Sequence, residues 1–142
     1  MKIACTMAPG RGDVDLLMTG LARTLQADGL RVCGTVQINS ERPDDGPCDM
    51  DVQVLPDGPV IRISQSLGKA SRGCRLDPDA LESAVGLVGA RLAAGADVLI
   101  MGCAGMAQYR ARLEAALELP VIEPCQAAAA MAVGRIALER GG

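Results

Sequence analysis

The stretch Asp97-Val-Leu-Ile-Met-Gly-Cys-Ala-Gly-Met106 decides the fold of this chain. Its four consecutive apolar residues, 98–101, are typical of a strand that is buried on both faces of a sheet. A helical pattern precedes this strand and begins with Asp77 at the N-cap and Pro78 at the first helical position. A second helical pattern, residues 106–117, follows it. The alternation of helix, strand and helix predicts an α/β domain.

The rest of the chain continues this alternation. The further strands that we expect are residues 2–6, 31–37 and 120–122, and the further helices are residues 14–27 and 126–140. Residues 51–55 and 60–64 flank Pro56-Asp-Gly58, which is a hairpin signal. Because crossovers through helices join parallel strands, the sequence predicts a three-layer α/β sandwich with a mostly parallel sheet, flavodoxin-like or Rossmann-like. The hairpin is expected to extend one edge of that sheet antiparallel.

Length and composition limit the possible functions. The 142 residues contain no linker or repeat, so we expect one domain over residues 1–142. Tyr109 is the only aromatic residue and the net charge is −3, which argues against nucleic-acid binding by stacking or by a basic surface. The chain has no histidine, so histidine-based catalysis and histidine metal ligands are excluded. No apolar run is long enough to span a membrane.

The six cysteines favour a reduced, cytoplasmic protein. No two of them have the C-x-x-C spacing, so a zinc ribbon is not expected, and we predict neither a metal site nor a cofactor. Cys33 lies within a strand-like run and is interpreted as a small core residue.

Parallel sheets bind ligands at the carboxyl ends of their strands. Four loops are expected to gather there: residues 7–13, 38–41, 102–106 and 123–126. The first loop has the position of a phosphate loop but lacks its lysine and its serine or threonine, so nucleotide hydrolysis is not expected. Backbone amides at Gly10, Arg11, Gly12 and Asp13 remain candidates for binding one phosphate, free or on a nucleotide, with help from Arg11. A tight turn with Asp13 as N-cap is the competing interpretation, which we favour.

A second glycine-rich loop, residues 66–75, carries Lys69, Arg72 and Arg75. These cations either close over an anionic ligand or are solvated surface charges, and the second interpretation is the commoner case.

Residues 1 to about 100 carry one resemblance to a known family. The matching segments are Met7-Ala-Pro-Gly-Arg-Gly-Asp13, Gly34-Thr-Val-Gln37, Ile63-Ser-Gln65, Gly73-Cys-Arg-Leu-Asp-Pro78 and Ala80-Leu-Glu82. This part resembles a bacterial domain family of unknown function with a nucleoside-triphosphatase-like fold, often encoded near molybdate-uptake genes. The resemblance implies a fold of that type, and a partner-binding module of this family is a third functional possibility.

Residues from about 97 to 138 carry a different resemblance. The matching segments are Gly102-Cys-Ala-Gly-Met106, Tyr109-Arg-Ala-Arg-Leu113, Pro120-Val-Ile-Glu-Pro124 and Gln126-Ala-Ala128. This part is similar to the last third of the hydantoin and aspartate/glutamate racemases. That resemblance implies that Cys103 is a catalytic thiol which exchanges a substrate Cα proton without a cofactor. The second thiol of such a racemase comes from another half-domain, and Cys5 is the candidate to replace it here.

The two resemblances meet at residues 97–102. We interpret this seam as recombination of two α/β fragments, and the abrupt switch favours design. The expected protein is therefore a recombined scaffold without an intact active site, with weak phosphate or nucleotide binding at the strand ends. The alternative is a cofactor-independent racemase or isomerase that uses Cys103 and Cys5.

Overall fold

The computed structural model describes residues 13–40, 48–68, 75–102 and 104–130. Its elements are α1 (Asp13–Ala27), β1 (Val32–Ser40), β2 (Asp49–Leu55), β3 (Val60–Arg62), α2 (Pro78–Ala93), β4 (Val98–Met101), the 3₁₀ helix η1 (Ala104–Tyr109), α3 (Arg110–Leu117) and β5 (Val121–Ile122). Residues 124–130 are also helical. None of the helices in these ranges is long and apolar enough to cross a membrane.

The five described strands form one mixed sheet in the order β3-β2-β1-β4-β5. β1 pairs parallel with β4, and β4 pairs parallel with β5. β1 and β2 pair antiparallel, as do β2 and β3, so the expected antiparallel hairpin is confirmed. The prediction of a mostly parallel sheet is corrected, because residues 41–48 are too short a connection for the crossover that parallel neighbours need. The predicted strand 2–6 lies outside the described residues.

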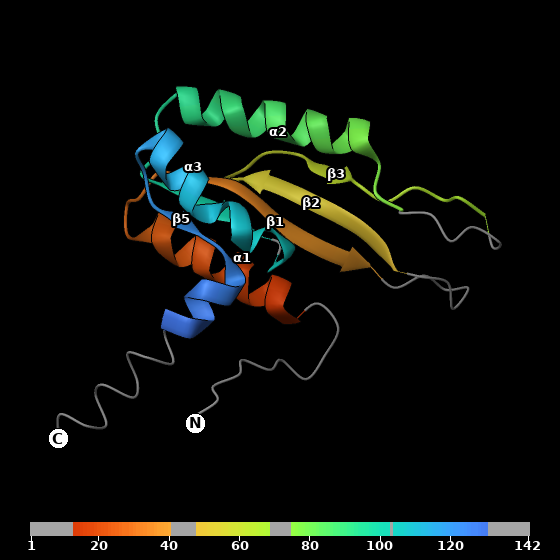
Figure 1. The fold of residues 1–142 in the computed structure, drawn as a ribbon, viewed down its shortest axis with the longest axis horizontal. Coiled ribbons are helices and arrows are strands. Elements are labelled where there is room, and N and C mark those ends of the chain that lie inside the picture. Colours follow the sequence, from red (N-terminus) through yellow and green to blue (C-terminus); the bar gives the residue numbers. More distant parts are fainter. Residues whose placement is uncertain (1–12, 41–47, 69–74, 103, 131–142) are drawn as a thin grey trace, which may run out of the picture.

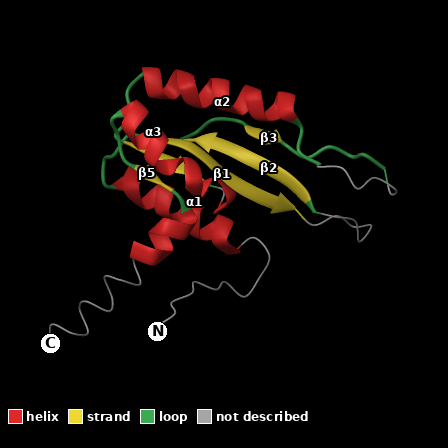
Figure 2. Ribbon diagram, in the orientation of Figure 1, coloured by secondary structure: helices red, strands yellow, loops and turns green. Residues whose placement is uncertain are grey.

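Helices cover both faces of the sheet (Figures 1 and 2). α1 packs on one face, where Met18 contacts a cluster that includes Val36 and Ile100. α2 and α3 cover the other face, where Leu99 lies in a second cluster. Neighbouring residues of β4 therefore point to opposite faces, as the alternation of a strand requires. The three-layer α/β arrangement is confirmed for these elements.

Cys33 is a core residue, as the sequence predicted. It is buried in the cluster between the sheet and helices α2 and α3, and its thiol donates a hydrogen bond to the Val98 carbonyl oxygen at 3.5 Å. Burial raises the pKa of this thiol above its usual value. Cys33 is therefore a poor nucleophile.

Two glycines allow β1 and β4 to approach each other closely. Gly34 has a φ of 116°, and a Cβ atom added to it would overlap the Ile100 carbonyl oxygen. A Cβ on Gly102 would lie 2.6 Å from the Thr35 carbonyl oxygen. These positions need glycine because the backbone of the neighbouring strand occupies the space of a side chain.

Several element boundaries differ from the sequence prediction. β1 continues to Ser40, through part of the loop expected from residue 38. The helix expected at 106–117 is a 3₁₀ turn followed by α3, and the loop expected at 123–126 is already helical from residue 124. β3 ends at Arg62, beyond which an isolated bridge joins Ser64 to Leu76. Such shifts arise because tertiary contacts decide where a periodic pattern ends.

The predicted N-cap of α2 is present. The Asp77 carboxylate accepts hydrogen bonds from the backbone N–H groups of Asp79 at 3.0 Å and Ala80 at 3.2 Å, and Pro78 is the first helical residue. We expect Asp77→Ala to lower the free energy of unfolding by about 1 kcal/mol, because both amides lose their acceptor. Asp77→Asn should retain most of the stability. Urea unfolding followed by circular dichroism measures both, and equal losses would contradict a capping role.

Candidate ligand-binding rim

The carboxyl ends of the parallel strands and the start of α1 form one edge of the sheet, which we call the rim. Asp15, in the first turn of α1, accepts a hydrogen bond of 2.6 Å from the side-chain amide of Asn39, near the end of β1. Gln37 donates to the side-chain oxygen of Asn39 at 2.9 Å. These contacts fix the first turn of α1 beside the end of β1, where open α/β sheets bind their ligands.

The rim offers both donors and acceptors to a ligand. The first N–H groups of α1 have no carbonyl partner within the helix, and the helix dipole favours an anion at this end. Burial raises the pKa of the Asp15 carboxyl group, and the hydrogen bond from Asn39 opposes that rise. Asp15, when ionised, repels an anion but accepts hydrogen bonds from hydroxyl or amine groups. The arrangement therefore suits a ligand whose phosphate is bound by the backbone N–H groups of α1 and whose neighbouring hydroxyl or amine group donates a hydrogen bond to Asp15.

Glu123 caps a second helix at the rim. It is fully buried directly after β5, and its carboxylate accepts hydrogen bonds from the backbone N–H of Cys125 at 2.9 Å and from that of Gln126. Pro124 begins the helix that follows, which is a favoured position for proline. The amides of this helix start are therefore occupied by the chain itself. The capping role of Glu123 is not evident from the sequence because glutamate is not among the usual N-cap residues, although Pro124 signals the start of a helix.

Most of the predicted site residues lie outside the described residues. Gly10, Arg11 and Gly12 are among them, as are both candidate catalytic thiols, Cys5 and Cys103. Asp13 is the first residue of α1, at the rim. The anion site and the two-thiol site therefore stay predictions.

Only one of the three cations of the second glycine-rich loop lies within the described residues. Lys69 and Arg72 lie outside the described residues. Arg75 donates a hydrogen bond to the Cys48 carbonyl oxygen at 3.1 Å and lies 3.7 Å from the Asp49 carboxylate. Arg62 pairs with Asp49 at 2.9 Å and also with Asp51. This network ties the loop to the hairpin, which favours a structural role for Arg75.

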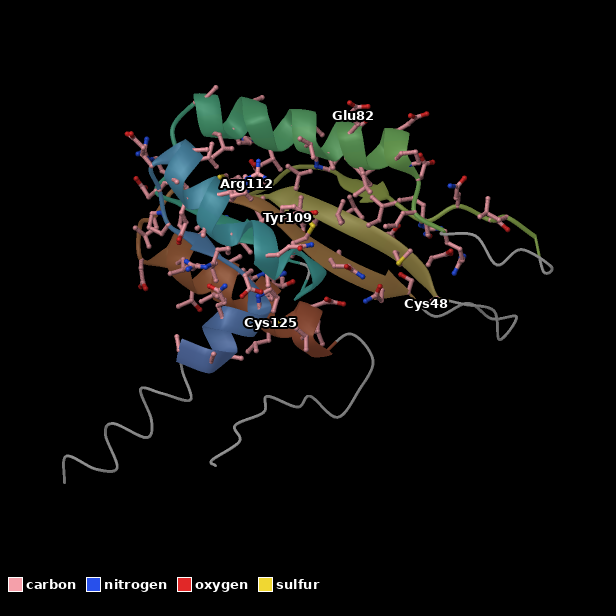
Figure 3. All side chains as sticks on the ribbon, in the orientation of Figure 1. Cys48, Glu82, Tyr109, Arg112 and Cys125 are labelled. Atoms are coloured by element: carbon pink, nitrogen blue, oxygen red, sulfur yellow. The ribbon has the colours of Figure 1, made fainter. Side chains whose placement is uncertain are left out.

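The described cysteines do not form a site together. Cys33 is in the core, while Cys48 precedes β2 and Cys125 lies at the rim, well away from Cys48 (Figure 3). Within the described ranges, no group of three or more cysteine, aspartate or glutamate side chains is arranged to hold a metal ion.

Comparison with known proteins places the chain in one family across the seam. The family described as "Protein of unknown function (DUF2478)" matches residues 3–117. A curated protein of Bradyrhizobium diazoefficiens, "Molybdenum import ATP-binding protein ModC 2", is 29% identical over 102 residues. That alignment covers 70% of this chain and 11% of the relative, so the chain spans about a tenth of that protein. No solved structure matches the chain.

The family match supports one of the two resemblances and not the other. It supports the resemblance of residues 1–100 to a family of unknown function. It also runs through residues 97–102 without a break, and neither match supports the racemase resemblance or a designed recombination.

Proposed function

This chain belongs to the DUF2478 family, and we propose that it binds a phosphate group, free or carried by a nucleotide, at the rim where α1 begins. The observation that carries the proposal is the hydrogen bond between Asp15 and Asn39, which sets the first turn of α1 beside the carboxyl end of β1. We also place the domain among flavodoxin-like or Rossmann-like folds, whose ligands bind at this edge.

The sequence before α1 supports a phosphate rather than another ligand. Gly10, Arg11 and Gly12 lead directly into the helix, and glycine allows a phosphate to approach the backbone closely. Binding is expected to be weak, because the lysine and hydroxyl side chains of a true phosphate loop are missing. Asp13 and Asp15 add negative charge at the same place, so we propose binding without hydrolysis.

The similarity to the ATP-binding import protein also supports a nucleotide as the carrier of the phosphate. Because the chain spans only about a tenth of that relative, the import function of the whole relative is not carried over.

We expect calorimetry to detect phosphate and ADP binding with a Kd of about 1 mM. Arg11→Ala should weaken it several-fold, because a charge-assisted contact is lost. Asp15→Asn should strengthen it, since a negative charge beside the anion is removed while the acceptor for Asn39 is kept. Arg112→Ala is the matched control, because Arg112 is exposed on α3.

Three outcomes would contradict this function. The first is no heat with phosphate or ADP at several times the expected Kd. The second is equal weakening by Arg11→Ala and Arg112→Ala, which would point to a general charge effect. The third is tight, magnesium-dependent ATP binding, which would mean that the loop before α1 is a complete phosphate site.

A further inference from the structure

A pocket of about 230 Å³ lies at the edge of the sheet opposite to the rim. Its lining residues come from the end of α1 and the α1–β1 connection, the start of β1, the end of β2, and the end of α2 with the α2–β4 connection. The residues that matter for its chemistry are Gln26, Leu30, Arg31, Pro56, Arg91 and Gly95. Two arginines and one glutamine thus belong to the lining of a pocket whose other lining residues are apolar or small.

Arg31 is held in place before any ligand arrives. Its Nε and Nη2 atoms donate to the Asp97 carboxylate at 3.1 and 2.7 Å, and its backbone N–H donates to the same carboxylate at 2.7 Å. These hydrogen bonds lower the pKa of Asp97 to about 2, so the pair stays charged over the physiological range. Asp97 thereby fixes the plane of the guanidinium group.

The third nitrogen of this guanidinium group lies against the wall of the pocket. A Cβ atom added to Gly95 would be 2.5 Å from Nη1 of Arg31. Gly95 has a φ of 100°, which a side chain would also disfavour. Glycine at this position therefore makes room for Nη1 of Arg31.

Arg91 reaches the pocket from α2 and is less tightly held. Its Nη2 atom lies 3.0 Å from the Asp57 carboxylate, whose side chain is 77% exposed. Exposed ion pairs of this kind contribute little, because water and salt screen them. A ligand anion can therefore replace Asp57 as the partner of Arg91 at small cost.

We propose that this pocket binds a small organic anion with a short apolar body, whose charged group contacts Arg31 and Arg91. The volume is below the roughly 300–1,000 Å³ of pockets for drug-sized ligands, so a nucleotide is too large. The side chains of Leu30 and Pro56 supply apolar surface for the body, and the amide of Gln26 is a further polar group. This site is separate from the rim and independent of phosphate binding there.

The test is a nuclear magnetic resonance titration of the ¹⁵N-labelled chain with butyrate at constant ionic strength. We expect saturable shifts of the amides of Leu30, Arg31 and Gly95, with a Kd of about 1–10 mM. Arg91→Gln should weaken binding about tenfold, because one charge-assisted contact is lost. Arg112→Gln makes the same change of charge on α3 and should leave the Kd unchanged. Butyramide, which is neutral and similar in shape, should cause no saturable shift.

A second variant keeps the test informative if Arg91→Gln disturbs the fold. Leu30 is 41% exposed, so Leu30→Asp adds a negative charge at the pocket without cutting into the core, and it should weaken butyrate binding as well. Absence of saturable shifts, equal binding of butyramide, or equal loss in Arg112→Gln would overturn the proposal. If inorganic phosphate binds this pocket as tightly as butyrate does, the proposal that the ligand has an apolar body is overturned. Phosphate shifts at Asp15 and Asn39 report on the rim, so failure of one site does not imply failure of the other.

Discussion

Replacing Gly34 by alanine should lower the free energy of unfolding by about 3 kcal/mol or more. The new Cβ atom would overlap the Ile100 carbonyl oxygen in the neighbouring strand, so β1 and β4 would have to separate locally. The φ of 116° at this residue adds backbone strain for any other amino acid. The loss is large because a backbone atom, unlike the end of a flexible side chain, cannot move aside cheaply.

Gly20→Ala is the matched control for this substitution. Gly20 lies within α1, and an added Cβ atom would meet nothing within 4 Å. Alanine should therefore stabilise the helix there by about 0.5–1 kcal/mol. Denaturant unfolding of the two variants should give changes of opposite sign. If Gly34→Ala is no less stable than Gly20→Ala, then the close approach of β1 and β4 is not a property of the folded protein.

Replacing Glu123 by alanine should cost about 3 kcal/mol of stability. The carboxylate is fully buried, and its loss leaves the N–H groups of Cys125 and Gln126 without an acceptor at the start of their helix. The substitution also removes buried volume and a negative charge that the helix dipole favours.

Glu123→Gln separates these contributions. Glutamine keeps the shape and one carbonyl acceptor, but it turns an NH₂ group toward a backbone donor. We therefore expect a loss of about 1–2 kcal/mol, smaller than that of alanine. Glu82→Ala on the outer side of α2 is the control and should change stability by less than about 0.5 kcal/mol (Figure 3). If Glu123→Ala lowers the free energy of unfolding as little as Glu82→Ala does, the capping role is contradicted.

Local signals in the sequence predicted much of the fold. The apolar run at 98–101 and the alternation at 51–55 are strands, and Asp77 caps α2 as expected. These features depend on neighbouring residues, so a short window contains the information. The antiparallel hairpin at one edge of the sheet was predicted, but the antiparallel pairing of β1 with β2 was not. It follows from how short the connection 41–48 is and from which distant strands pair.

The candidate sites were less predictable for the same physical reason. Arg31 and Asp97 lie 66 residues apart in the chain, so no local sequence pattern predicts that they form an ion pair beside a pocket. Glu123 acts as a cap although glutamate rarely does so. The motif-based predictions depend on residues that lie outside the described ranges, namely Cys5, Gly10, Arg11, Gly12 and Cys103. A sequence pattern can therefore indicate that a residue of a suitable type stands at the start of a helix or the end of a strand. It does not show which distant residue the fold brings into contact with it.

The position of β1 in the sheet also has a consequence for how quickly the chain folds. β1 meets β2 after a short connection, whereas its partner on the other side, β4, arrives only after the hairpin and α2 have been passed. Closing a long loop costs more chain entropy than closing a short one, and distant pairings slow folding. We therefore expect the antiparallel half to assemble early and the docking of β4 to set the folding rate. The proposed pocket is lined in part by Gly95, which lies just before β4, so this part of the protein would be among the last to form.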